Sequence, residues 1–153
     1  TVVNFKTLHK THFSVAWMYL RGLKMINGRA KGHAFERELI KKFQDEFGEC
    51  ADHLKRNLDQ YQVAGKADIE FNNLMIEAKR YAKGSWFKPD WWEQTLTSAG
   101  ETHVPVLIYK YDHQPIRFVF RLKDIMGEPY IEGTATVDYA TGIMLMREIL
   151  EYQ

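Results

Sequence analysis

The segment from Val104 to Tyr109 is the feature that most limits how this chain can fold. Its residues, VPVLIY, form an unbroken apolar run, which is typical of a strand that other elements cover on both faces. Residues 116–122 alternate between apolar and polar and follow the turn-like segment 112–115, so they are expected to pair with this strand as a hairpin. A strand covered in this way favours an α/β fold, in which a central mixed sheet is flanked by helices.

Apolar residues at helical spacing predict two helices that cover this sheet. One is an amphipathic helix over residues 30–47 that ends at Gly48. The other covers residues 89–100, with Asp90 as its N-terminal cap and Glu93 completing a capping box. Its buried face is expected to carry Trp92, Leu96 and Ala99. The remaining predicted elements are a short helix or hairpin within 13–23, a strand over 51–57 (alternatively a short helix over 51–58), a loop over 58–67, strands over 74–79 and 134–137, and a helix over 143–152.

The size and composition of the chain exclude several classes of protein. Its 153 residues suit one hydrophobic core. The single cysteine, Cys50, excludes a disulfide framework or a multi-cysteine zinc site and suits a reducing compartment. No apolar run approaches the roughly 18 residues of a membrane span, so an intracellular, cytoplasmic protein without a membrane partner is expected. The sequence also lacks the motifs of zinc proteases, P-loop nucleoside triphosphatases and serine hydrolases.

Positive charge is concentrated at the N-terminus. Residues 1–33 contain six of the 21 basic residues and none of the 20 acidic residues. Such clustering favours a polyanion such as nucleic acid as the partner, although a solvated tail has the same composition. We therefore divide the chain into a basic N-terminal extension, residues 1–29, and one domain, residues 30–153.

Three acidic residues and one lysine are candidates for a metal-dependent reaction. Glu77 and Lys79 lie on the same face of the strand predicted over 74–79, because strand side chains alternate. A hairpin that pairs residues 67–69 with this strand would bring Asp68 next to Glu77. Glu36 belongs to the buried side of its predicted helix. Carboxylate oxygens of this kind suit Mg²⁺ or Mn²⁺, and Lys79 could hold or deprotonate a water molecule.

Each of these residues also has a purely structural interpretation. Glu77 and Lys79 could form a solvated ion pair on an edge strand. Asp68 could close a turn, and Glu36 could be favoured by the dipole near the start of its helix.

The order of the motifs resembles that of a known enzyme superfamily. The runs GRAKGHAFEREL (28–39), KADI (66–69) and IEAK (76–79), followed by residues 92–94, 99–100 and 105–110, are similar to the PD-(D/E)xK nucleases. Within that superfamily they resemble Holliday-junction resolvases of the archaeal type and their phage relatives. Ala67 stands where the family signature has proline. The resemblance implies a restriction-endonuclease-like core, which makes residues 30–153 the nuclease domain.

The resemblance also implies roles for individual residues. Asp68 and Glu77 would bind the metal ion together with the backbone carbonyl of Ala78. Glu36 would bind the metal directly or through water, and Lys79 would orient the attacking water. Gln94 is similar to a polar residue that lines such sites, and an exposed helix glutamine is the alternative.

Basic and aromatic side chains near these motifs are the candidate contacts to DNA. Arg56 and Asn57 could grip a backbone phosphate, or they could be a surface pair on a strand. Trp86 or Trp91 could stack on bases or contact a second subunit, whereas Trp92 is predicted to lie in the core. The candidate DNA-binding residues are Arg29, Lys31, Arg37, Arg56, Asn57, Arg80 and Lys83.

These inferences predict a Mg²⁺- or Mn²⁺-dependent endonuclease that cuts branched DNA, with a four-way junction as the preferred substrate and a homodimer as the active species. One alternative is a nuclease of the same fold that cuts duplex, nicked or flapped DNA in restriction or repair. The other is a DNA-binding module that keeps the fold without catalysis.

Overall fold

The computed structural model describes residues 8–54 and 67–151. Five strands form one sheet in the order β1-β2-β3-β4-β5. β2 and β3 are parallel and are connected through α2, whereas all other neighbours are antiparallel, so the predicted mixed sheet is confirmed. The elements are α1 (Leu8–Phe47), the 3₁₀-helix η1 (Gly48–Ala51), β1 (Ile69–Phe71), β2 (Leu74–Tyr81), α2 (Pro89–Ala99), β3 (Val104–Tyr111), β4 (Arg117–Arg121), α3 (Leu122–Met126), β5 (Thr134–Asp138) and α4 (Tyr139–Glu151).

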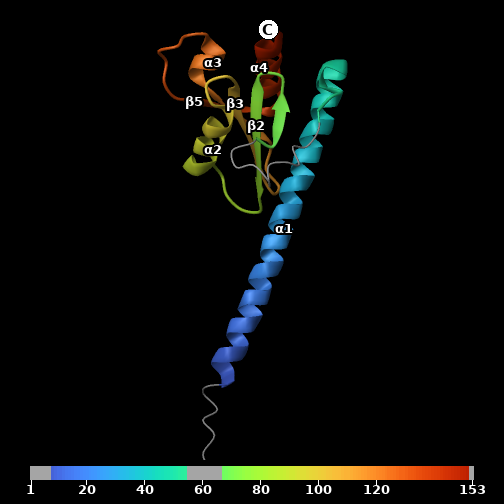
Figure 1. Cartoon of the computed structure of the whole chain (residues 1–153), viewed down its shortest axis with the longest axis vertical. Helices are drawn as coiled ribbons and strands as arrows, with labels where there is room; N and C mark the ends of the chain where they lie inside the picture. The colour runs from blue at the N-terminus through green and yellow to red at the C-terminus, as the bar shows by residue number, and fades with distance from the viewer. Residues whose placement is uncertain (1–7, 55–66, 152–153) are drawn as a thin grey trace, which may run out of the picture.

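Helices cover both faces of the sheet, as the apolar strand β3 predicts. α1 and α4 pack on one face, where their apolar side chains join Ile76 and Ala78 of β2 in the larger core. α2 packs on the other face, where Trp91 meets Leu107 and Tyr109 of β3 in a smaller core. α1 and α2 accordingly lie on opposite sides of β2 (Figure 1). The alternation of side chains in β2 decides which of its residues face each helix.

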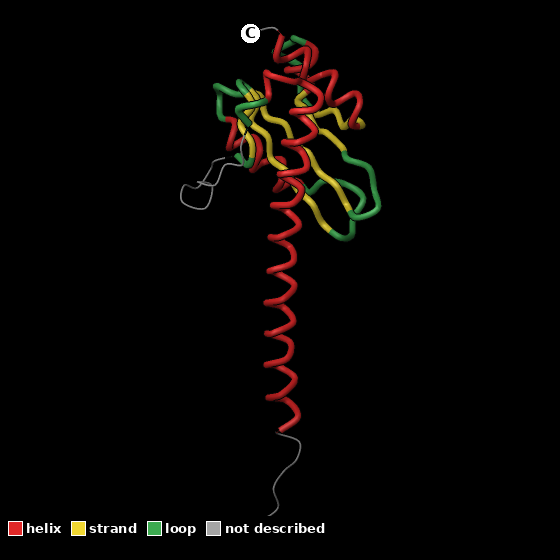
Figure 2. The backbone as a smooth tube through the Cα atoms, turned by 90° about the vertical axis from the view of Figure 1, so that its right-hand side faces the viewer, coloured by secondary structure: helices red, strands yellow, loops and turns green. Residues whose placement is uncertain are grey.

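The first helix is longer than predicted. α1 contains 40 residues in place of the expected helix over 30–47 and a separate element within 13–23. Its N-terminal part extends well away from the rest of the molecule (Figures 1 and 2). α1 crosses the predicted boundary between residues 29 and 30 without a break, and the division into an extension and a domain stays a prediction. The predicted end is confirmed, because Gly48 follows the helix with a φ of 61°, a conformation that favours glycine.

The strand predicted over 51–57 is wrong for the residues that the structure describes. Ala51 ends η1, and residues 52–53 continue as a turn. Ala51 and Leu54 are both buried in the larger core, and their spacing of three places them on one side of a helical turn instead of on one face of a strand. The short-helix alternative was closer. Residues 55–57 and most of the predicted loop over 58–67 lie outside the described residues.

The second helix has the predicted extent, but its orientation differs by one residue. Lys88 is the N-cap and makes no side-chain capping bond, so the cap predicted at Asp90 is wrong. Pro89 occupies the first helical position, which proline favours, and this moves Asp90 into the first turn. Trp91, Thr95 and Ala99 form the buried face, so only Ala99 of the predicted face is correct.

The strands of the second half match the sequence pattern closely. The hairpin of β3 and β4 and the strands β2 and β5 are confirmed. α4 begins at Tyr139, four residues earlier than expected, and the short helix α3 was not predicted. Within residues 8–54 and 67–151, none of the helices combines the length and the apolar character that crossing a membrane requires.

Candidate functional site

Three contacts between α2 and β2 organise a polar site on the α2 face of the sheet. The hydroxyl of Ser98 donates to Glu77 Oε1 at 3.0 Å. The side chain of Gln94 donates to Glu77 Oε2 at 3.2 Å and accepts from Lys79 Nζ at 2.9 Å. One turn earlier, Trp91 stacks on Tyr81 with ring centroids 4.9 Å apart. Residues three and four positions apart on the helix thus face residues two positions apart on the strand. Ser98 and Gln94 hold Glu77, Gln94 also holds Lys79, and Trp91 packs on Tyr81.

Asp68 reaches the same site from the position directly before β1. The antiparallel register pairs Ile69 with Ile76, and one further step places Asp68 opposite Glu77. Asp68 Oδ2 accepts a hydrogen bond from the backbone N–H of Ala78 at 2.8 Å. The N–H and C=O of a strand residue point to the same edge, so the Ala78 carbonyl also points toward Asp68. The predicted hairpin is confirmed.

The electrostatics of Glu77 favour a cation beside it. Glu77 is 0% exposed. Burial, followed by the charge of Asp68, raises the pKa of Glu77 from 4.5 to about 8. Lys79 Nζ lies 3.6 Å from Glu77 Oε2 and acts in the opposite direction, as does the hydrogen bond from Ser98. A further positive charge between the two carboxylates would restore the ionised form of Glu77.

The donor set around Glu77 fits a hard divalent cation. Two carboxylates and a backbone carbonyl are oxygen ligands of the kind that Mg²⁺ and Mn²⁺ take, with water completing the shell. Within the described part of the chain, however, no three His, Cys, Asp or Glu residues lie close enough to hold a metal ion.

Glu36 is the member of the predicted set that the structure does not bring into such a cluster. It is buried as expected, but it belongs to α1, whose neighbouring residues Phe35 and Leu39 pack in the core on the other face of the sheet. The direct or water-mediated role of Glu36 stays a prediction.

The candidate DNA-binding residues fall into three groups. Lys31 and Arg80 both bind Asp112, at 2.6 and 3.3 Å, and Arg80 also lies 3.9 Å from Glu38. The other described candidates, Arg29, Arg37 and Lys83, are exposed. Arg56 and Asn57 lie outside the described residues. Exposure leaves the second group accessible to phosphate, whereas Lys31 and Arg80 would exchange Asp112 for it.

The burial of the two adjacent tryptophans differs from the prediction. Trp91 is buried beneath Tyr81, so the prediction that it contacts DNA or a second subunit is wrong. Trp92 is only half-buried against the smaller core. The one-residue difference in the orientation of α2 explains both outcomes. Trp86 is exposed, as a contact residue needs to be.

Sequence reasoning missed two residues that shape the site. Ser98 holds Glu77, and the signal was available, because it follows Gln94 by four residues on the same predicted helix. Asp112 holds Lys31 and Arg80 from the turn after β3. No local pattern relates residue 112 to residue 31, so only the fold could reveal this contact.

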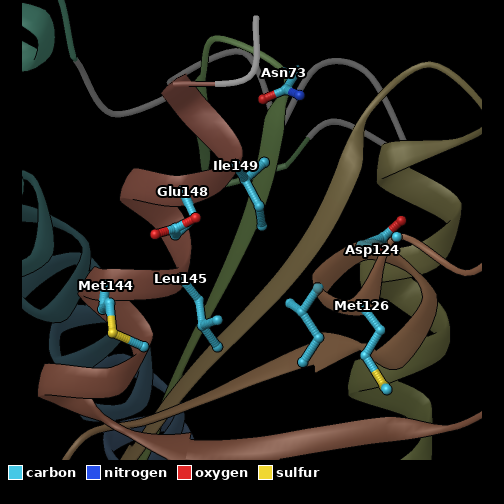
Figure 3. A pocket seen from close by; sticks show the side chains of 9 residues that line it. Asn73, Asp124, Met126, Met144, Leu145, Glu148 and Ile149 are labelled. Carbon is cyan, nitrogen blue, oxygen red and sulfur yellow. The ribbon is translucent and has the colours of Figure 1, made fainter.

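A hollow of about 580 Å³ lies elsewhere on the molecule. It is lined by residues of α3 and α4, including Met126, Met144 and Leu145, and by Asn73 in the turn before β2 (Figure 3). None of the predicted site residues lines it. The polar site on the α2 face is therefore the candidate for chemistry.

Comparisons with known proteins place the chain among nucleases. The model of the phage PDDEXK endonuclease family matches residues 27–143. Among solved structures, the chain is similar to Hjc of Archaeoglobus fulgidus, a Holliday junction resolvase from an archaeal hyperthermophile. The two chains are 18% identical, the similarity covers 76% of this chain and 98% of that chain, and the TM-score is 0.46. No curated protein matches the sequence.

Proposed function

Because the chain belongs to the phage PDDEXK endonuclease family, we propose that it hydrolyses the backbone of branched DNA with Mg²⁺ or Mn²⁺ as cofactor. The observation that carries the proposal is the set of contacts, between 2.8 and 3.6 Å, that joins Glu77, Lys79 and Gln94 to one another and Asp68 to the backbone N–H of Ala78. The restriction-endonuclease-like core supplies the frame, since the interior strand β2 carries both Glu77 and Lys79.

Each polar residue of the site has a task in this reaction. Asp68, Glu77 and the carbonyl of Ala78 would hold the metal ion. When bound, the ion would stabilise the negative charge that develops on the phosphate oxygens and would lower the pKa of a water molecule bound to it. Lys79 orients the attacking water or stabilises charge on the phosphate through its ammonium group. Gln94 fixes Lys79, and Ser98 fixes Glu77, so neither side chain has to reorganise during the reaction.

A cleavage assay with divalent metal tests the assignment. Asp68→Ala and Glu77→Ala are expected to abolish cleavage while DNA binding is kept or strengthened, because each removes a repulsive carboxylate. Glu70→Ala is the matched control, since Glu70 lies on the same hairpin but pairs with His103 at the surface. If both site variants cut at the wild-type rate, the assignment is wrong.

The preference for branched DNA is supported by the order of the motifs at 28–39, 66–69 and 76–79 and by the basic N-terminal segment. A synthetic four-way junction competed against linear duplex of the same sequence tests it. Faster cutting of nicked, flapped or fully paired DNA would assign the enzyme to restriction or repair. Calorimetric titration with Mg²⁺ tests the non-catalytic alternative, which predicts no metal binding with or without DNA.

A homodimer completes the proposal, because two symmetric cuts in a junction need two active sites at a fixed separation. Sedimentation equilibrium at micromolar concentration should show the dimer. Detection of the monomer alone would refute the proposed homodimer. An enzyme that cuts DNA works where DNA is accessible, and we place it in the cytoplasm.

A further inference from the structure

Two large aromatic side chains are exposed where β2 leaves the polar site. Tyr81, the last residue of β2, is 45% exposed, and Trp86, in the segment between β2 and α2, is 58% exposed. Tyr81 is two residues beyond Lys79 on the same face, which places it about 7 Å from Lys79 and about 13 Å from Glu77 along the strand. Stacked nucleotides rise about 3.4 Å each, so the Tyr81 ring lies within a few nucleotides of a phosphate bound at the polar site.

The backbone that carries Trp86 is anchored. The hydroxyl of Tyr111 donates to the carbonyl of Trp86 at 2.5 Å, and the side chain of Gln114 donates to the carbonyl of Gly84 at 2.8 Å. Gly84 has a φ of 152° and lies so close to the Tyr111 ring that a Cβ would sit 2.2 Å from it. The backbone that carries the exposed Trp86 ring is therefore held in place, and a segment that is already ordered loses little freedom when a ligand stacks on its side chain.

Tyr81 is held in the same manner. Its ring stacks on the buried Trp91 with an interplanar angle of 16°, and Lys88 Nζ lies 5.4 Å from its centroid. Trp91 packs against one face of the Tyr81 ring, and 45% of Tyr81 stays exposed to solvent.

The charge around the two rings is suited to a nucleic acid. Lys83 and Lys88 are exposed in the same segment, and within residues 8–54 and 67–151 neither forms an ion pair with a carboxylate. Asp90 is the exposed acidic residue of this stretch. Exposed rings interleaved with lysines that are not paired with a described carboxylate are the combination that binds unpaired nucleotides, because every base offers a π-face and every phosphate a negative charge.

We propose that Tyr81 and Trp86 stack on unpaired bases of the DNA substrate within a few nucleotides of the scissile phosphate. The inference rests on the proposed function and names its substrate class more closely: DNA in which a base near the cut is extruded or unpaired, as at a fork, a flap or the centre of a junction.

Binding to fluorescent DNA without divalent metal tests the stacking site separately from catalysis. The probe is a duplex with one unpaired 2-aminopurine, compared with the fully paired duplex of the same sequence in EDTA. Trp86→Ala and Tyr81→Ala are expected to weaken binding of the unpaired probe at least tenfold and to remove the quenching of 2-aminopurine. Binding of the paired duplex should change less than twofold. Trp86→Phe, which keeps an aromatic ring, should bind the unpaired probe nearly as tightly as the wild type.

Tyr130→Ala is the matched control, because Tyr130 is 91% exposed but lies between α3 and β5, away from the site. Thermal melting of each variant verifies that it is folded. Equal losses on both DNAs, no loss on either, or a wild-type protein that does not prefer the unpaired probe would overturn the inference. A changed oligomeric state with unchanged DNA binding would also overturn it and assign the rings to a subunit contact.

The two proposals can fail separately. If the variants lose only the unpaired probe while wild-type protein cuts no DNA, the stacking site stands and the proposed function fails. If Asp68-dependent cleavage is present and the Trp86 variants bind and cut like the wild type, the reverse holds.

Discussion

Replacing Glu77 by glutamine should stabilise the metal-free protein at neutral pH while it abolishes cleavage. Glu77 has a pKa of 4.5 in an unfolded chain and about 8 in the folded protein. Below pH 4.5 both states hold the proton and there is no cost. Between pH 4.5 and 8 the unfolded state releases the proton first, so stability falls by about 1.4 kcal/mol per pH unit. At pH 7 the accumulated cost is roughly 3 kcal/mol.

Glu77→Gln removes this cost but weakens the hydrogen bond that Gln94 donates to Glu77, a loss of about 1 kcal/mol. The variant should therefore be more stable than the wild type by about 2 kcal/mol at pH 7 and less stable by about 1 kcal/mol below pH 4.5. The two stability curves should cross near pH 5, by the same arithmetic.

Urea unfolding in EDTA, followed by circular dichroism between pH 4.5 and 8, measures the difference. Glu70→Gln is the control, and at its exposed position the change should stay within about 0.5 kcal/mol. A difference between Glu77→Gln and the wild type that is constant over this pH range would refute the reasoning. Added Mg²⁺ should stabilise the wild type more than the variant, because only the wild type keeps both carboxylates.

Three further outcomes are expected. Gly142→Ala should lower the free energy of unfolding, measured with urea, by about 1–3 kcal/mol, because the new Cβ would lie 2.4 Å from the buried Phe118 ring. Gly32→Ala in α1, where a Cβ would have nothing within 4 Å, should raise the free energy of unfolding by up to about 1 kcal/mol. The pKa of Asp112 is lowered, chiefly by its hydrogen bond from Lys31, so its contribution to stability is present above pH 3.8 and is lost as the pH falls through the folded pKa. Asp112→Asn should therefore make stability less dependent on pH in the acid range. The same change should increase DNA affinity, because it frees Lys31 and Arg80. Deleting residues 1–24 removes four basic side chains and should reduce the slope of log affinity against log salt by up to about 0.9 for each lost phosphate contact; an unchanged slope would mean that this segment does not contact DNA.

The sheet could be predicted because its residues follow a period of two. The alternation in β2 correctly assigned Glu77 and Lys79 to one face and Ile76 to the other. The apolar run of β3 required helices on both sides, which α1 and α2 provide. The buried pair Ala51 and Leu54 was misassigned, because so short a segment supports either period.

The site was predicted where its residues are close in sequence or joined by a hairpin. Asp68 and Glu77 met this condition. The orientation of α2 did not follow from its pattern, since tryptophans at 91 and 92 fit either face and the start at Pro89 decides between them. The contacts of Ser98 and Asp112 join distant segments, so they depend on how helices pack on the sheet and not on any local spacing.

The pairing of α2 with β2 also restricts how this enzyme can vary during evolution. Adding or deleting one residue within α2 would rotate everything beyond it by about 100°, and Ser98 and Gln94 could no longer both reach their partners on the strand. Changes in length should therefore be tolerated in surface segments such as residues 127–133 and be absent between positions 91 and 98, where relatives can diverge only by substitution.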